Sequence, residues 1–116
     1  LAMLAWMGFN YLRIRRAAKI VDNEEFESLI RTGQLIDLRD PAEFHRKHIL
    51  GARNIPSSQL KTSLAALRKE KPVLLYENQR AQRVTNAALY LKKQGFSEIY
   101  ILSYGLDSWK GKVKTN

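Results

Sequence analysis

The segment 73–83, VLLYENQRAQR, holds the residues with the clearest potential for chemistry. Its apolar start predicts a buried strand that ends at Glu77, and a helical pattern begins at Val84 after six polar or small residues. A polar loop between a strand and a helix is a frequent location for active-site residues. A glutamate in that loop can act as a nucleophile toward phosphorus or an acetal carbon. However, the stretch contains no histidine or second acid to serve as its general-acid partner.

Other common catalytic and metal-binding arrangements are missing from the chain. Cysteine is absent from all 116 residues, which excludes disulfides, thiolate metal sites and cysteine nucleophiles. His45 and His48 are three residues apart, but no further histidine completes a metal site, so we expect no bound metal. There is also no P-loop, dinucleotide-binding fingerprint or nucleophile elbow, and we expect no cofactor.

Strand and helix patterns alternate along the chain, which predicts a parallel α/β sheet covered by helices on both faces. The expected strands are 18–22, 34–39, 53–56, 72–76 and 98–102, and the expected helices are 24–32, 41–47, 59–70, 84–94 and 105–111. Segment 72–76 is the most apolar strand and is therefore expected at the centre of the sheet. The sequence also predicts that His48 orders a turn before Gly51 and that Trp109 packs at the sheet edge.

The end of strand 34–39 carries Asp37 and Arg39. Parallel sheets bind ligands at the carboxyl ends of their strands, so these two residues are candidate neighbours of the loop that follows strand 72–76. A purely structural role, in which they tie loops together by hydrogen bonds, is the simpler interpretation.

The chain is strongly basic, with 20 Lys and Arg against 11 Asp and Glu and a formal net charge of +9. Such a charge favours an acidic protein, anionic lipid or nucleic acid as a partner, although a solvated basic surface without a partner explains it equally well. No basic cluster is interleaved with aromatic residues, so nucleic acid is the weakest of these candidates.

The first twelve residues, LAMLAWMGFNYL, contain a single polar member and are followed directly by RIRR. A membrane-spanning helix needs about 20 apolar residues, and this run is shorter. Because the chain begins at Leu1 and not at Met, we expect segment 1–17 to be the inner end of a truncated membrane anchor. The arginines would place domain 18–116 on the cytoplasmic face, where anionic lipid can bind them. An amphipathic helix packed on the domain is the alternative, in which case the protein is cytoplasmic.

Three motifs resemble those of the rhodanese family. LIDLRDPAEFHRKHILGARNIP is similar to the family's first signature, KPVLLYENQRAQRVTNAALYLKKQGF to its second, and YGLDSWKG to its closing element with glycine and tryptophan. The resemblance covers about residues 18–113. It implies a rhodanese-like fold, a five-stranded parallel sheet with flanking helices.

In that family the loop after the central strand holds a catalytic cysteine, and backbone N–H groups that point toward the sulfur stabilise its thiolate and persulfide. The resemblance implies that Glu77 takes the cysteine position. It also implies that the active-site-like loop and the start of the following helix comprise Glu77, Asn78, Gln79, Arg80, Ala81, Gln82 and Arg83. The family's usual glycine becomes Arg80 and its usual arginine becomes Gln82. We expect Glu77 to be ionised and bound either by the loop amides or by Arg80 or Arg83.

Two functions of different classes follow from these residues. The first is a catalytically degenerate rhodanese-like module with a binding or adaptor role toward an unknown protein partner, at the cytoplasmic face of a membrane. The second is an enzyme, either a sulfurtransferase that uses a partner's cysteine or a carboxylate-based hydrolase. The absence of cysteine favours the first, because no persulfide can form on this chain.

Overall fold

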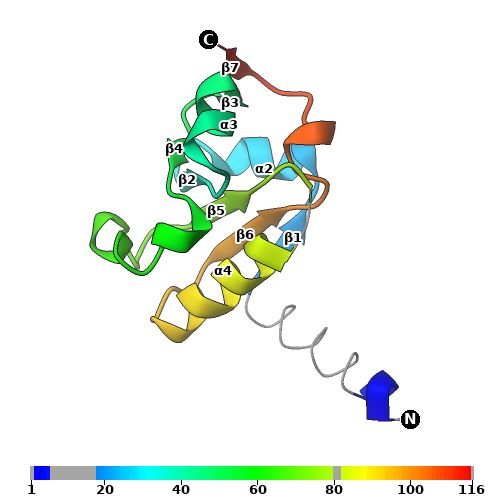
Figure 1. The fold of residues 1–116 in the computed structure, drawn as a ribbon, viewed down its shortest axis with the longest axis vertical. Coiled ribbons are helices and arrows are strands. Elements are labelled where there is room, and N and C mark those ends of the chain that lie inside the picture. Colours follow the sequence, from blue (N-terminus) through cyan, green and yellow to red (C-terminus); the bar gives the residue numbers. More distant parts are fainter. Residues whose placement is uncertain (1, 6–17, 80–81, 116) are drawn as a thin grey trace.

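The computed structural model describes residues 2–5, 18–79 and 82–115, and the core of the fold is a five-stranded parallel sheet (Figure 1). Its strand order is β1-β6-β5-β2-β4. The strands are β1 (Lys19–Val21), β2 (Gln34–Asp37), β4 (Arg53–Asn54), β5 (Val73–Tyr76) and β6 (Ile99–Leu102). The predicted class of fold and the central place of β5 are both confirmed.

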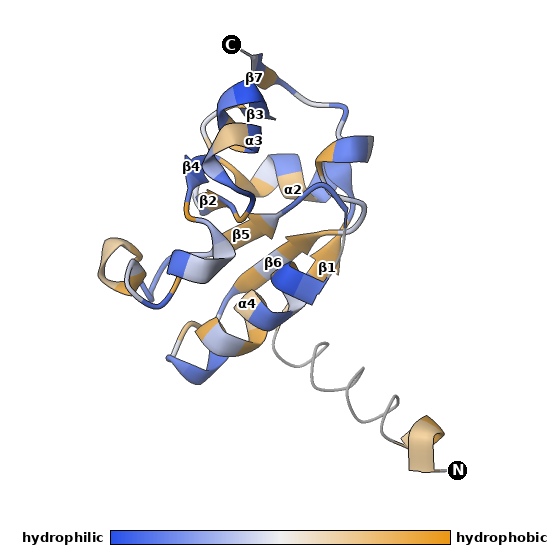
Figure 2. Cartoon of the chain, viewed as in Figure 1, coloured by the Kyte–Doolittle hydropathy of each residue, from blue (hydrophilic) through white to orange (hydrophobic). Residues whose placement is uncertain are grey.

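All four residues of β5 are buried, because the strand has a neighbour on each side and a hydrophobic layer on each face. Side chains alternate between the faces of a strand. Accordingly, Val73 and Leu75 belong to one hydrophobic cluster, and Leu74 and Tyr76 belong to the other. Figure 2 shows this apolar centre along β5 and β6.

Helices pack on both faces of the sheet, as predicted. Helix α4 (Gln82–Lys93) buries Val84, Ala87, Ala88 and Leu91, and these residues join the cluster of Val73 and Leu75. Helix α2 (Asn23–Leu29) buries Phe26 in the other cluster. The third helix, α3 (Pro41–Arg46), starts at its proline, where the missing N–H costs no hydrogen bond.

The ends of α2 and α4 follow the local sequence. Asp22 caps α2, and its Oδ1 accepts a hydrogen bond from the Glu25 N–H at 2.9 Å. After α4, Gly95 has a φ of 99°, a conformation that favours glycine at the end of a helix. The helix itself begins at Gln82, two residues before the predicted start at Val84.

The predicted helix over 59–70 is wrong. The chain forms two short 3-10 turns there, η1 (Ser57–Gln59) and η2 (Leu64–Ala66), and no serine side chain caps either of them. The Thr62 hydroxyl donates to the Gln59 carbonyl at 3.0 Å. Such side-chain bonds to the nearby backbone compete with the backbone hydrogen bonds of a helix, which makes threonine and serine poor residues for a helix interior. Leu60 and Leu67 are still buried in the core, so the apolar spacing reflected burial and not an α-helix.

A second, two-stranded antiparallel sheet was not predicted. It consists of β3 (Lys47–Ile49) and β7 (Val113–Thr115), with His48 opposite Lys114. His48 therefore lies in a strand, and its expected position in a turn is wrong. The predicted helix at 105–111 is only a 3-10 turn, η3 (Leu106–Ser108), beyond which the chain extends into β7.

Most of the segment interpreted as a membrane anchor, residues 6–17, lies outside the described residues. Within the ranges that the structure describes, none of the helices combines the length and the apolar character needed to cross a membrane. The division into segment 1–17 and domain 18–116 stays a prediction.

Candidate functional site

The loop after β5 begins with a buried carboxylate. Glu77 directly follows Tyr76, the last residue of the strand, and only 7% of its surface is exposed. Its Oε2 accepts a hydrogen bond from the Val84 backbone N–H at 2.8 Å. Val84 lies in the first turn of α4, where backbone N–H groups have no partner within the helix. The carboxylate therefore lies where the start of α4 offers a backbone donor without a partner in the helix, and where the helix dipole has its positive end.

The electrostatic surroundings of Glu77 are mixed. Burial raises the pKa of this carboxyl above its usual value, and the nearby carboxylates of Glu43 and Asp37 act in the same direction. The Val84 N–H and the Arg83 charge lower the pKa but do not cancel the effect of burial. Arg83 acts through its charge alone, because none of the described ion pairs or hydrogen bonds joins it to Glu77, and Arg80 lies outside the described residues. That Glu77 is ionised stays a prediction.

The segment after β6 holds the backbone of the loop in place. The Leu106 N–H donates to the Glu77 carbonyl at 2.8 Å, and the Asp107 N–H donates to the Asn78 carbonyl at 3.0 Å. Gly105 allows this approach, because a Cβ at this position would lie 2.4 Å from the Asn78 carbonyl oxygen. Its φ of 69° also lies in the region that favours glycine.

Asp37 and Arg39 form a buried ion pair beside the loop. The Arg39 Nη2 lies 2.8 Å from Asp37 Oδ2, and the exposed fractions of the two side chains are 5% and 0%. Arg39 also donates through Nη1 to Asn78 Oδ1 at 3.1 Å and through Nη2 to the Lys47 carbonyl. One guanidinium therefore connects the end of β2, the loop after β5 and the start of β3.

The structure brings two acids to the loop that the sequence analysis did not single out. Asn78 Nδ2 donates to Glu43 Oε2 at 2.7 Å, and Gln79 Nε2 donates to Asp107 Oδ2 at 3.3 Å. The pairs are 35 and 28 residues apart in the chain, so no local pattern indicates them. A hollow of about 430 Å³ lies here, lined by Arg39, Glu43, Arg46, Lys47, Asn78, Leu106 and Asp107.

The last two of the predicted loop residues, Gln82 and Arg83, belong to α4. The Gln82 side chain donates to Asn86 Oδ1 at 2.8 Å and so remains on the helix, and Arg83 is exposed on the helix's first turn. Arg80 and Ala81, the other two predicted loop residues, lie outside the described residues.

His48 and Trp109 make structural contacts, and none of their described contacts involves Glu77. The His48 ring stacks on Phe44 with centroids 3.8 Å apart, and its Nδ1 lies 2.7 Å from the Phe44 carbonyl oxygen. Half-buried Trp109 meets Phe26 edge to face at 5.9 Å. Across residues 2–5, 18–79 and 82–115, no three His, Asp or Glu side chains lie together in a way that could hold a metal ion.

Comparison with known proteins shows the family of the chain. A sequence model of the rhodanese-like domain matches residues 22–112. The chain belongs to the rhodanese-like domain family. The uncharacterized protein YqhL of Bacillus subtilis is 46% identical to it over 113 residues, which cover 97% of this chain and 89% of that protein. The thiosulfate sulfurtransferase GlpE of Stutzerimonas stutzeri is 34% identical over 95 residues, 79% of this chain and 84% of that protein.

Solved structures with a similar fold agree with the architecture. The rhodanese-related protein of Thermoplasma volcanium has a TM-score of 0.76 at 22% identity, covering 84% of this chain and 99% of that chain. BH2092 of Bacillus halodurans has a TM-score of 0.74 at 22% identity, covering 99% of this chain and 87% of that chain. At these identities the likeness concerns the fold alone.

The loop after β5 can accept and donate hydrogen bonds but offers no sulfur atom. Each of its described polar side chains from Glu77 to Gln79 is already bonded within the chain, to Val84, to Arg39 and Glu43, or to Asp107. Among the described residues, every fully buried side-chain nitrogen or oxygen has a hydrogen-bond partner. The described side chains at the start of this loop, residues 77–79, are therefore engaged within the chain.

Proposed function

We propose that this protein is a non-catalytic rhodanese-like binding module whose strand-to-helix loop is closed by its own carboxylate. The observation that carries the proposal is that the chain has no cysteine and that the buried Glu77 side chain accepts from the Val84 N–H. In this proposal Glu77 takes the position that a cysteine has in sulfurtransferases of the family.

A carboxylate cannot replace the thiolate in sulfur transfer, because an acyl oxygen–sulfur bond would be attacked by water. A negative charge on Glu77 also repels thiosulfate and phosphate, which are anions themselves. The Val84 N–H, a donor that an entering anion would need, is occupied. The module would therefore act through its surface and not through chemistry in this loop.

Two measurements on the purified chain test this function. In a thiosulfate-to-cyanide assay we expect no thiocyanate above the uncatalysed rate, and clear turnover would contradict the proposal. In an NMR titration with sulfate, Glu77→Gln should bind at least about tenfold more tightly than wild type, with shifts centred on Asn78 and Val84. Glu27→Gln removes an equal charge from an exposed position on α2 and is the control. Equal sulfate affinities for wild type and Glu77→Gln would show that Glu77 does not close the loop.

The name of the relative GlpE, a thiosulfate sulfurtransferase, makes sulfur transfer with a partner's cysteine the second candidate. In that case the domain would bind thiosulfate and present it to a thiol on another protein. Sulfide release from thiosulfate in the presence of a dithiol, above the rate without protein, would favour this candidate. No increase is expected if the module is non-catalytic.

The proposal includes a location at the cytoplasmic face of a membrane and an unknown protein or anionic-lipid partner. It is supported by the apolar segment LAMLAWMGFNYL, by the RIRR that follows it and by the net charge of +9. Recovery of the intact protein in the membrane fraction is the expected result. Recovery entirely in the soluble fraction would contradict the location without affecting the proposal for Glu77.

A further inference from the structure

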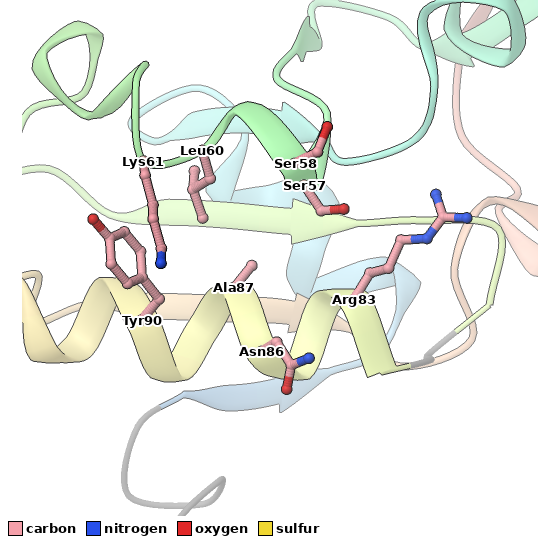
Figure 3. A pocket seen from close by; sticks show the side chains of 8 residues that line it. All are labelled: Ser57, Ser58, Leu60, Lys61, Arg83, Asn86, Ala87 and Tyr90. Carbon is pink, nitrogen blue, oxygen red and sulfur yellow. The ribbon is translucent and has the colours of Figure 1, made fainter.

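A second hollow lies on the flank of α4, opposite the 3-10 turn η1 (Figure 3). It has a volume of about 410 Å³. Ser57, Ser58, Leu60 and Lys61 line one wall, and Arg83, Asn86, Ala87 and Tyr90 of α4 line the other. Apart from Arg83, none of these residues belongs to the loop that begins at Glu77, and none lines the hollow beside Asn78.

The charge of this hollow has one sign. Lys61 and Arg83 are its charged lining residues, and no acidic residue lines it. The three ion pairs found among the described residues involve neither of these two cations. Lys61 instead places its Nζ 5.6 Å from the centroid of the Tyr90 ring. Two exposed cations that take part in none of the described ion pairs make an anionic ligand favourable.

Polar donors and an apolar floor lie together in the hollow. In Figure 3 the Ser57 hydroxyl points toward the Arg83 guanidinium from the facing wall. Neither group has a hydrogen-bond partner within the part of the chain that the structure describes. Between this end and the Lys61–Tyr90 end lie Leu60 and Ala87, both buried in the hydrophobic core.

We propose that the hollow between η1 and α4 binds a small organic phosphate with a flat apolar body. The phosphate would lie between the Ser57 hydroxyl and the Arg83 guanidinium, whose planar array of donors suits phosphate oxygens. The apolar body would lie over Leu60 and Ala87 and reach the Tyr90 ring. The volume lies within the range of about 300–1,000 Å³ that is usual for small-molecule sites. The inference does not depend on the proposal for Glu77.

A small molecule fits these observations better than an acidic peptide. The two cations, Arg83 and Lys61, lie at opposite ends of one short hollow. Lys61 lies over the Tyr90 ring, and Tyr90 follows Arg83 by seven residues on α4, which corresponds to about 10 Å along the helix axis. An acidic peptide would need more cations than these two, and all other residues that line the hollow are uncharged.

NMR titration of the full chain with phenyl phosphate and with inorganic phosphate tests the proposal. Phenyl phosphate should shift the signals of Ser57, Ser58, Arg83 and Ala87 and should bind at least about fivefold more tightly than inorganic phosphate. Arg83→Gln should weaken phenyl phosphate binding about tenfold or more. Arg31→Gln removes the same charge from an exposed position two residues after α2 and should change the affinity less than about twofold.

Ser57→Ala separates a direct role of the hollow from an effect through the loop, because Ser57 has no described contact with Glu77. It should weaken phenyl phosphate binding about threefold and leave the Asn78 and Val84 signals of the free protein unchanged. The proposal would be overturned by shifts confined to Arg39, Lys47 and Asn78, by equal weakening in Arg83→Gln and Arg31→Gln, or by no binding at 10 mM. Tighter binding of a hexaglutamate peptide at the same residues would overturn the assignment to a small molecule.

Discussion

The Glu77 carboxylate and the Val84 backbone N–H lie 2.8 Å apart and join the end of β5 to the first turn of α4. The acceptor belongs to the side chain that follows the central strand, and the donor is one of the amides that a helix leaves unpaired at its start. This single hydrogen bond spans the loop between β5 and α4. It also makes Glu77 the residue whose replacement should have the most informative consequences.

Stability should depend on pH through Glu77. Burial raises the pKa of this carboxyl above 4.5, so the folded protein holds this proton more tightly than the unfolded chain does. The contribution of Glu77 to stability is therefore favourable at low pH and decreases as pH rises from the usual carboxyl pKa through the raised value. Relative to wild type, Glu77→Gln should gain in free energy of unfolding as pH rises from about 4 to about 7. Urea unfolding at several pH values measures this difference, with Glu27→Gln as the control, and parallel curves for wild type and Glu77→Gln would contradict it.

The buried Asp37–Arg39 pair should be essential for stability. Replacing Arg39 by methionine keeps most of the side-chain volume but leaves the Asp37 carboxylate buried without its ion-pair partner. Removing one member of a buried pair typically costs about 3–5 kcal/mol, and we expect a loss of this size in urea unfolding. Arg68→Met breaks the exposed pair with Glu70 and should change stability little. Similar losses in the two variants would show that burial of the Arg39 pair is not what matters.

Gly105 should resist substitution for a steric reason beyond its backbone angle. Gly105 and Gly51 have φ values of 69° and 91°, so alanine is strained at both positions. Only at Gly105 would the added Cβ meet other atoms, the backbone of Glu77 and Asn78 within 2.5 Å, whereas nothing lies within 4 Å at Gly51. Gly51→Ala should cost about 1–2 kcal/mol, and Gly105→Ala should cost clearly more.

The loop signals give a second readout for Gly105→Ala. The added Cβ should displace Asn78, and its amide signal in a proton–nitrogen NMR spectrum should therefore shift, while Gly51→Ala leaves that signal in place. Equal destabilisation by the two alanines, with Asn78 unmoved, would mean that the approach of Gly105 to the loop is unimportant.

Domain 18–116 should fold without segment 1–17. Every residue of the two hydrophobic clusters described by the structure lies between Ala18 and Val113. Deleting residues 1–17 should therefore leave a cooperative unfolding transition and a circular dichroism spectrum of mixed helix and strand. A deletion variant with an unfolded spectrum would show that the segment is structural.

Much of this molecule follows from local sequence. The four apolar residues of β5 predicted its central position, because only a strand with neighbours on both sides and layers on both faces can bury all of them. The capping residue Asp22, Pro41 at the start of α3 and Gly95 after α4 are equally local signals. The change from apolar strand to polar loop at Glu77 also indicated where to look for a site.

Other features depend on residues that meet only in the folded chain. Glu43 reaches Asn78, and Asp107 reaches Gln79, across 35 and 28 residues. The antiparallel pairing of β3 with β7 is similarly long-range, and it placed His48 in a strand where the sequence indicated a turn. Leu60 and Leu67 have a helical spacing, yet their segment forms 3-10 turns. Both leucines still reach the core from this irregular segment.

The sequence by itself determined the fold class, the position of the loop and the absence of a cysteine nucleophile, because periodicity, capping and residue chemistry act over a few neighbouring residues. Only the tertiary structure decided that Glu77 is buried and bonded to Val84, that Arg39 joins three segments and that a cationic hollow lies beside α4. Burial and long-range contacts set the pKa values and the partners of these groups, and both arise when distant segments pack together.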